Sequence, residues 1–470
     1  MLLLKIYLDL AVITLVILAF LLVIELLFDI INKKIKQMEE SMVTINIDSS
    51  LNEDVFIIGA GEAGGRIAQE FKSQGFANVV AINSSKTDLD ALSFITEENK
   101  LLIPVTNGTG TGKNPGVIRS AIDDFYGDVT SFLNKHRNNS TSAMVIVGGG
   151  GGTGGGLGIV LAQVVSELEL KVGMIFTLPV NNESTLVFVN AIDNLKEIYA
   201  NVTRDGTTEA AISPFIVVDN NVMRKRYNEG GIAEVWKHVN EAIVRVMRGF
   251  TENSKRPSKG DTLDGAELKR LFKKGGSCAV GSADILETDS AEDVLSKIKN
   301  SFFVEEFDLT TATACGIIVV GSLSTLSNPA SRKTIDSVYD AIPKIMGGGD
   351  IFRGVYDQED VEYLRVYLMF NGLVFPDAKL SEMTKGIRDG YNKLKSQENR
   401  IGDGVHISFG SDVANAFSDS SSAGGKIVRN AGSMFNRPAS SPNPPSQNLP
   451  KINIIREPKE SSPDVKRKER

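Results

Sequence analysis

Cysteine and histidine are scarce in this sequence. Its 470 residues include two cysteines, Cys278 and Cys315, and three histidines, His136, His238 and His406. They show no metal-ligand spacing, and two cysteines in apolar surroundings do not make a disulfide framework. We therefore expect two buried free thiols. Because the histidines have no partner pattern for a histidine-activated nucleophile, we expect them to be structural or exposed.

Neither sign of charge dominates the composition. The formal net charge is −7, and 23% of the residues are charged. These values are typical of an ordinary globular protein and give no indication of nucleic-acid binding by the whole surface. The length is sufficient for two domains with appendages.

A single long hydrophobic run lies near the N-terminus, between Leu10 and Phe28, with Glu25 as its only charge. Its length is close to what a helix needs to cross the hydrocarbon core of a membrane. We therefore predict a transmembrane anchor within residues 1–36 that contacts the lipid bilayer through residues 10–32.

The charges around this run predict its orientation. Lys33, Lys34 and Lys36 follow it, so the positive-inside rule places the downstream chain in the cytoplasm. No small-residue cleavage site follows, which argues against a removed signal peptide. Asp9 and Asp29 flank the run and leave open an interfacial or self-associating helix.

A conventional P-loop ending in Gly-Lys-Ser/Thr is missing from the segment Val145–Gly158. Here a β-branched run is followed by eight glycines interrupted only by Thr153, and then by an apolar pattern that suits a buried helix. Glycine N–H groups and a helix N-terminus favour a bound polyphosphate. Because this loop has no lysine, the phosphate charge must be met by backbone dipoles, a metal or groups elsewhere.

Two further glycine-rich loops are present. GAGEAGGRIAQEF, at Gly59–Phe71, follows the predicted strand Val55–Ile58, and NGTGTGKNP, at Asn107–Pro115, precedes a predicted helix at Gly116–Phe132. In an open parallel sheet, loops at the carboxyl ends of strands bind ligands. Three glycine-rich loops that converge on one edge therefore predict that each loop contacts a different phosphate of one nucleotide.

Polar residues end the other predicted strands of this region. Asn83 and Ser84 follow Val79–Ile82, where a dinucleotide-binding Rossmann domain would carry an acid for the ribose. A Rossmann-type NAD-dependent oxidoreductase therefore remains only as an alternative. The remaining strand ends lead to PVNNEST after Val172–Leu178 and to Asp219-Asn220-Asn221 after Phe215–Val218.

A long amphipathic helix is predicted at Ile232–Phe250. Trp236 and Asn240 are four residues apart and share one face. The Trp236 ring could stack on a purine and the Asn240 amide could hydrogen-bond to its edge, although Trp236 could also be a core residue. Asp264 and Glu267 lie three residues apart in a later helical turn, where acids commonly interact only with the helix dipole.

The sequence predicts an α/β protein with a parallel-sheet nucleotide-binding domain, a long central helix and a second α/β domain. We expect the following divisions: transmembrane anchor 1–36, linker 37–53, nucleotide-binding domain 54–230, central helix 231–252, acidic loop and following helix 253–276, second domain and C-terminal helix 277–400, and disordered tail 401–470. The tail is rich in serine, proline and asparagine, with too little apolar content to fold alone.

The motifs, in their order and spacing, resemble the tubulin/FtsZ superfamily. GGGTGGG at Gly150–Gly156 is similar to the tubulin signature loop, and GAGEAGG, AINSS, GTGTGKNP, PVNNEST and LDGAE occupy the neighbouring positions. The resemblance covers about residues 54–375. Within the superfamily, GAGEAGGRIA and the basic tail look most like the TubZ and bacteriophage tubulin branch.

The resemblance implies that GTP and Mg²⁺ bind between successive subunits of a filament. It places phosphate contacts on the three glycine-rich loops and residues beside the Mg²⁺ ion after the second strand. It also implies an acidic residue that binds the ribose, and residues that hydrogen-bond to the guanine or stack on it. The implied nucleotide-binding residues are Gly61, Glu62, Ala63, Gly64, Asn83, Ser84, Gly110, Thr111, Gly112, Gly151, Gly152, Thr153, Gly154, Glu183, Asn220, Trp236 and Asn240.

The same resemblance implies that Asp264 and Glu267 are the catalytic pair, which one subunit presents to its neighbour's γ-phosphate. A carboxylate can orient the attacking water, while positioning and electrostatics provide most of the catalysis in phosphoryl transfer. Glu62 departs from the amide usual in tubulins, and we predict that it has a metal role. Trp236 replaces the usual Phe or Tyr.

We therefore expect a membrane-anchored GTPase that assembles head-to-tail, since such heterologous contacts propagate when they do not close. Its process could be DNA, plasmid or phage positioning, or cell division. The first alternative is a nucleotide-binding membrane scaffold without catalytic activity, and the Rossmann-type oxidoreductase is the second. The basic end of the tail, Lys466–Arg470, could contact DNA, a DNA-binding adaptor or an anionic surface.

Overall fold

The structure is a computed structural model that describes residues 54–202, 210–258, 260–272, 275–359, 361 and 363–401. The predicted membrane anchor at 1–36, the linker at 37–53 and the tail beyond residue 401 lie outside these ranges. Within them, no helix combines the length and the apolar character needed to cross a membrane.

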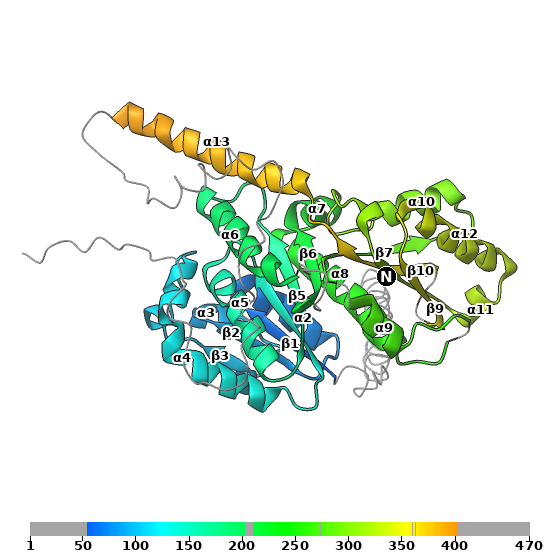
Figure 1. The fold of residues 1–470 in the computed structure, drawn as a ribbon, viewed down its shortest axis with the longest axis horizontal. Helices are drawn as coiled ribbons and strands as arrows, with labels where there is room; N and C mark the ends of the chain where they lie inside the picture. Colours follow the sequence, from blue (N-terminus) through cyan, green and yellow to red (C-terminus); the bar gives the residue numbers. More distant parts are fainter. Residues whose placement is uncertain are drawn as a thin grey trace, which may run out of the picture. The chain divides into compact units, whose positions relative to one another are not determined.

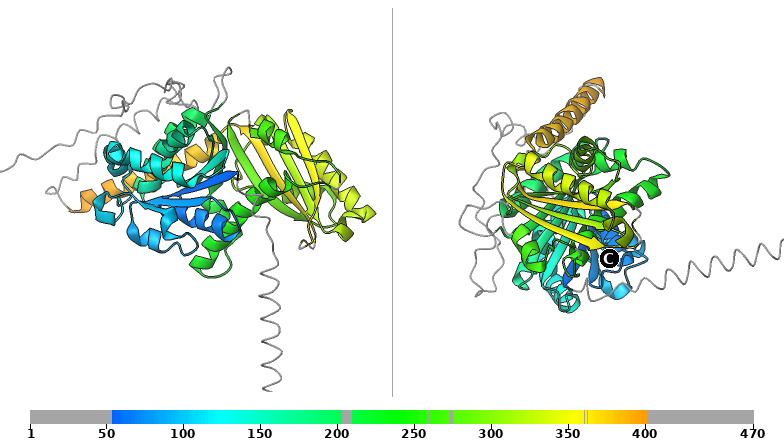
Figure 2. Two further views of the ribbon diagram at one scale, coloured as in Figure 1. Left: turned by 90° about the horizontal axis from the view of Figure 1, so that it is seen from below. Right: turned by 90° about the vertical axis from the view of Figure 1, so that its right-hand side faces the viewer.

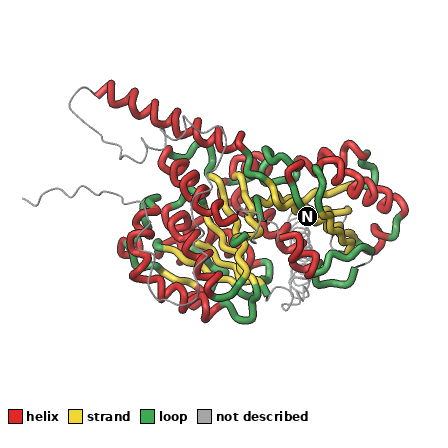
Figure 3. Tube along the Cα trace, in the orientation of Figure 1, coloured by secondary structure: helices red, strands yellow, loops and turns green. Residues whose placement is uncertain are grey.

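Ten strands form one sheet. They are β1 Val55–Ala60, β2 Val79–Asn83, β3 Lys100–Leu102, β4 Ser142–Gly148, β5 Lys171–Leu178, β6 Ile212–Asp219, β7 Ser277–Ile285, β8 Ala314–Gly321, β9 Asp350–Asp357 and β10 Leu364–Leu373. Their order across the sheet is β3-β2-β1-β4-β5-β6-β7-β10-β8-β9. Strands β1 to β7 pair in parallel, and β10 is antiparallel to both of its neighbours, β7 and β8. Figures 1 and 3 show these strands with helices packed on both faces.

Helices connect most of the strands along the chain. Those of the first half are α2 Gly61–Ser73, α3 Lys86–Asp90, α4 Pro115–His136, α5 Gly152–Glu167, α6 Thr185–Val202, α7 Asn220–Arg226 and α8 Ile232–Asn253. Those of the second half are α9 Gly265–Phe272, α10 Ala291–Lys299, α11 Leu323–Leu326, α12 Pro329–Ile345 and α13 Asp377–Ile401. Short 3₁₀ turns lie at Glu97–Asn99, Thr106–Gly108 and Leu309–Thr311.

Alternation along the strands divides the core into two layers. Phe56 and Ile58 of β1 pack into the layer that contains α4, α5 and α6, whereas Ile57 packs into the layer that contains α2 and α8. Residues buried on both faces are typical of strands in parallel sheets covered by helices. The same alternation continues in β8, where Ile317 faces α10 and α12 and Ile318 shares a layer with α8.

The two halves of the sheet join at β6 and β7. Phe215 pairs with Ser277 and Ile216 with Cys278 in parallel register. The sequence predicted a second domain from residue 277 but not this continuity of the sheet. Cys278 and Cys315 are free and fully buried, as expected, and burial raises the pKa of both thiols.

The prediction that the whole glycine run is a loop is wrong. Helix α5 begins at Gly152, so only Gly149–Gly151 separate it from β4. Close packing explains these helical glycines better than flexibility does. A Cβ at Gly156 would lie 2.8 Å from the Cβ of Ile118 in α4, closer than real Cβ atoms approach their neighbours.

Helix α13 lies along α6, as the view in Figure 1 shows, and Figure 2 shows it (orange) from two further sides. The first half of this helix packs against the body of the protein. Met383 and Ile387 are buried there, and Gly386 lies beside the ring of Phe188 in α6.

Candidate nucleotide site

The predicted phosphate, magnesium-side and ribose residues come together at the carboxyl edge of the parallel strands. Strands β1, β2, β4, β5 and β6 run in the same direction. The polar or glycine-rich segments that follow these strands therefore all begin at the same edge of the sheet. Such an edge is where open parallel sheets bind ligands.

The first glycine-rich turn packs directly against the third. Gly61 has a φ of +70°, a backbone conformation that favours glycine. A Cβ there would lie 2.8 Å from the backbone nitrogen of Gly154. Substitution at Gly61 would therefore separate the first turns of α2 and α5, and helix N-termini are places where backbone N–H groups attract anions.

Hydrogen bonds connect the second strand end to the other loops. The hydroxyls of Ser84 and Thr153 lie 2.6 Å apart, and the backbone N–H of Gly110 donates to the carbonyl of Ser84 at 3.1 Å. The Asn83 side chain accepts from the backbone N–H groups of Ser84 and Ser85, which shapes this turn. The three predicted phosphate segments thus form one connected structure.

Two asparagines of α6 hold the glycine loop in place, and the sequence analysis missed both. Asn190 donates its amide to the carbonyls of Lys113 and Gly150 at 2.7 and 3.3 Å, and Asn194 donates to the carbonyl of Gly149 at 2.7 Å. Both side chains are buried. Their four-residue spacing on an otherwise apolar helix face was the available signal.

The predicted ribose and guanine contacts lie on neighbouring loops. Glu183 follows β5, and its carboxylate forms an ion pair with the Lys113 ammonium group at 2.9 Å. Asn220 is the first residue of α7, where Asp219 caps the helix by accepting from the backbone N–H of Asn221. The side chain of Asn221 accepts from the backbone N–H of Asn181, which joins these two loops.

Glu62 has a partner that the sequence analysis did not consider. Its carboxylate accepts from Arg66, one helical turn later, at 3.0 Å. This pair neutralises a carboxylate near the predicted phosphates without a metal. Among the residues described by the structure, no group of three or more His, Cys, Asp or Glu side chains is arranged to hold a metal ion. The metal role of Glu62 stays a prediction.

Trp236 and Asn240 lie on α8, at the end that follows α7. Both side chains are half-buried, and Trp236 packs against the layer formed by α2 and α8. The Arg224 guanidinium lies 5.9 Å from the Trp236 ring centroid, within cation–π distance.

The acidic pair Asp264 and Glu267 lies at the opposite end of α8. This helix has 22 residues and so spans about 33 Å. Just beyond it, Lys255 forms an ion pair of 2.5 Å with Asp54, which directly precedes β1 at the amino edge of the sheet. The predicted catalytic pair is therefore remote from the phosphate loops of its own chain.

Asp264 has a structural role of its own at the start of α9. Its carboxylate accepts from the backbone N–H groups of Ala266 and Glu267 at 2.9 and 2.8 Å. In the described part of the chain, one buried oxygen of Glu267 has no hydrogen-bond partner. The expected dipole interaction of acids in a first turn is therefore present, together with one unused carboxylate oxygen.

A buried lysine of α13 contacts the end of β6, next to the predicted guanine contact Asn220, and sequence reasoning missed it. Lys379 lies 2.5 Å from the carboxylate of Asp219, 2.9 Å from Glu306 and 2.5 Å from Glu382. Burial alone would lower the pKa of Lys379, but hydrogen bonds to these carboxylates outweigh it and raise the pKa. Glu382 also accepts from Asn181, so α13 contacts the loops after both β5 and β6.

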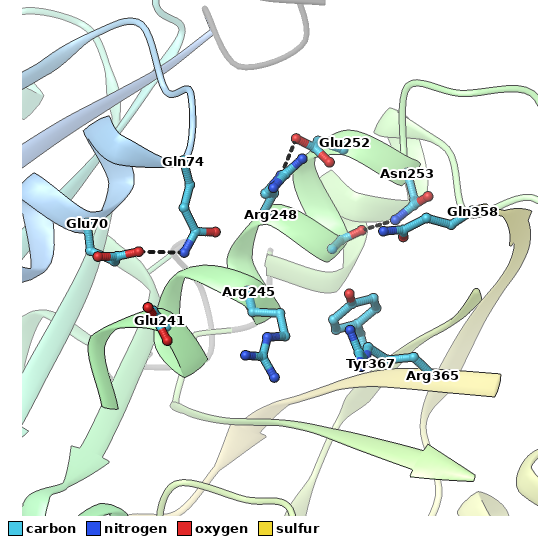
Figure 4. Close-up of a pocket in the computed structure, with 11 residues that line it drawn as sticks. Glu70, Gln74, Glu241, Arg245, Arg248, Glu252, Asn253, Gln358, Arg365 and Tyr367 are labelled. Atoms are coloured by element: carbon cyan, nitrogen blue, oxygen red, sulfur yellow. Dashed lines mark hydrogen bonds and ion pairs between the residues drawn. The ribbon is translucent and has the colours of Figure 1, made fainter. Parts of the chain in front are cut away.

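A cavity of about 370 Å³ lies apart from these loops, between α2, α8 and β10 (Figure 4). Arg245, Arg248 and Tyr367 are among its lining residues. None of the predicted nucleotide-binding or catalytic residues lines it.

The fold and the connected loops define an α/β protein with glycine-rich turns and helix N-termini at one edge of its sheet, an arrangement that suits a bound polyphosphate. Residues 54–227 match the Tubulin/FtsZ family, GTPase domain. Residues 54–227 are therefore similar to the GTPase domain of this family. Members of this family are GTPases that bind GTP or GDP with Mg²⁺.

Curated and solved relatives extend the similarity beyond this domain. The tubulin-like protein CetZ of Pyrococcus abyssi is 25% identical over 326 residues, which cover 67% of this chain and 85% of the relative. A GTPγS-form protofilament of TubZ from Bacillus thuringiensis serovar israelensis has a TM-score of 0.62 at 21% identity, covering 75% of this chain and 95% of that one. CetZ2 from Haloferax volcanii, a GTPγS-bound protofilament, has a TM-score of 0.59 at 22% identity, covering 73% and 99%. We predicted a likeness to the TubZ and bacteriophage tubulin branch, and these values do not distinguish that branch from the CetZ proteins.

Proposed function

We propose that this protein is a GTPase that assembles head-to-tail into filaments and hydrolyses GTP at the contact between subunits. The separation of the two parts of its site carries the proposal. The phosphate loops lie at the carboxyl edge of the sheet, whereas Asp264 and Glu267 follow Lys255, which contacts the amino edge. One chain cannot bring both parts together, but two chains stacked along α8 can.

The relatives support the same arrangement. Solved TubZ and CetZ2 structures with this fold are described as protofilaments. A contact between two different faces of identical subunits propagates when it does not close. Assembly would then place the acids of one subunit beside the terminal phosphate of the next, where they orient the attacking water.

The experiment combines sedimentation with phosphate release on the full-length chain. With GTP and Mg²⁺ we expect pelletable polymer and a rate of phosphate release per subunit that rises with protein concentration. With GDP we expect less polymer. A rate per subunit that does not depend on concentration would contradict hydrolysis between subunits, and binding without any phosphate release would favour the idle scaffold.

We also propose that residues 10–28 anchor these filaments to a membrane, with the GTPase domain in the cytoplasm. The length of the hydrophobic run and the lysines that follow it support this proposal. The full-length chain should float with lipid vesicles in a density gradient, and a variant lacking residues 1–36 should not. Equal flotation of both would refute the anchor.

The cargo is the least constrained part of the proposal. The basic end of the tail at Lys466–Arg470 suits an anionic partner such as DNA or an anionic surface. Plasmid or phage positioning is the role we favour over cell division, because the sequence resembles the TubZ and phage tubulin branch. A fluorescent fusion that follows DNA in its native cell would support it, and one that forms a ring at the division site would refute it.

A further inference from the structure

The phosphate loops contain no cationic side chain. Residues 61–64, 110–112 and 151–154 include no lysine or arginine. Backbone N–H groups and helix N-termini attract an anion, but they provide only partial charges. A side chain beside these loops could therefore add a full positive charge.

Three cationic side chains of the described residues near the predicted nucleotide contacts, Arg66, Lys86 and Arg224, have local partners. Arg66 pairs with Glu62 and Lys86 with Asp90, each one turn away on the same helix. Arg224 lies over the ring of Trp236. Lys113 is different, because its partner Glu183 belongs to another loop of the nucleotide site.

The backbone of Lys113 is fixed against the glycine loop. Its carbonyl accepts from the amide of Asn190, which also donates to the carbonyl of Gly150. A Cβ at Gly152 would lie 3.1 Å from the carbonyl carbon of Lys113. The Lys113 side chain therefore begins at the first turn of α5, directly after the predicted phosphate contact Gly112.

The ion pair that holds this side chain is weak enough to exchange. The side chains of Lys113 and Glu183 are 54% and 34% exposed, and exposed pairs contribute about 0–1 kcal/mol. A hydrogen bond from a lysine ammonium group to a phosphate oxygen is charge-assisted and roughly twice as strong as a bond between neutral groups. A bound polyphosphate can therefore compete with Glu183 for the ammonium group.

We propose that Lys113 is a phosphate-binding residue. When nucleotide binds, the Lys113 ammonium group leaves the Glu183 carboxylate and forms an ion pair with the terminal phosphate. The freed Glu183 carboxylate then accepts a hydrogen bond from the ribose. One exposed ion pair thus couples recognition of the two ends of the nucleotide. This inference rests on the proposed function, since it requires that GTP is the ligand.

The test compares Lys113→Ala, Lys113→Gln and Lys113→Arg with Lys86→Ala as the matched control, because Lys86 is also exposed and paired. Calorimetry with Mg²⁺ measures the affinity of each full-length variant for GDP and for a non-hydrolysable GTP analogue. We expect Lys113→Ala and Lys113→Gln to bind the analogue about 10- to 100-fold more weakly, as for the loss of one charge-assisted hydrogen bond. Affinity for GDP should change less than about threefold, and Lys113→Arg and Lys86→Ala should remain within about fivefold of the parent.

The outcomes distinguish the inference from the proposed function. A parent protein that binds neither nucleotide refutes both. A parent that binds the analogue while Lys113→Ala and Lys113→Gln bind it equally well refutes only the role of Lys113. Equal losses for GDP and the analogue refute the terminal phosphate as its target, and an equal loss in Lys86→Ala shows a general effect of surface charge. Circular dichroism establishes that each variant is folded.

Discussion

Replacing Lys379 by methionine should strongly destabilise this protein. The substitution keeps an unbranched side chain of similar length but removes the positive charge that faces three carboxylates. Asp219 and Lys379 have side chains only 1% and 5% exposed, so Asp219 would become a buried and unpaired charge. Breaking a buried pair in this way costs about 3–5 kcal/mol. Glu306 and Glu382, at 30% and 41% exposure, regain solvation and add little.

Urea unfolding at neutral pH measures this effect, and a second substitution provides its control. In Lys379→Met combined with Asp219→Asn, the asparagine oxygen can still accept from the backbone N–H of Asn221, which donates to the Asp219 carboxylate at 2.8 Å in the parent protein. No unpaired charge is then buried, so we expect the double variant to regain at least about 2 kcal/mol. A single variant within about 1 kcal/mol of the parent, or a double variant no more stable than the single one, would refute the reasoning.

The remaining predictions concern catalysis, the glycine loop and pH. Asp264→Asn keeps an oxygen that can cap α9 but loses the charge, so phosphate release should fall at least about tenfold while stability changes by less than about 1 kcal/mol. Asn194→Ala leaves the buried carbonyl of Gly149 without its amide donor, which should cost about 1–3 kcal/mol in urea unfolding and weaken GTP binding. Burial first, and then Lys135, lower the pKa of His136 below its usual 6.5. The stability that neutral His136 provides is therefore complete above pH 6.5 and is lost as the pH falls through the lowered pKa.

Each of these predictions has a clear contrary result. An Asp264→Asn variant that hydrolyses GTP at the parental rate would remove this acid from the mechanism. Parental stability and GTP affinity in Asn194→Ala would show that the glycine loop needs no support from α6. Replacement of His136 by glutamine should reduce the loss of stability between pH 7 and pH 5, and an unchanged loss would assign it to other groups.

The sequence by itself predicted most strands and helices and the nature of the site. Runs such as Val55–Ile58 and Val172–Leu178 are apolar and β-branched because parallel strands are buried on both faces. Glycines followed by an apolar helix indicated a polyphosphate. These signals are local, so neighbouring residues are sufficient to produce them.

Other features depend on residues that are distant in sequence. The start of α5 at Gly152 is set by packing against α4 and α6, so glycine composition alone predicted a loop that is too long. Asn190 and Asn194 support the glycine loop only because α6 crosses it.

Tertiary structure alone decided how the charged groups pair and which ends of the molecule they occupy. Lys379 lies 160 residues from Asp219, yet the fold buries them together. Lys113 and Glu183 likewise meet only because the loops after different strands share one edge of the sheet. The length of α8 separates Asp264 from that edge, and no local pattern of residues encodes such a distance.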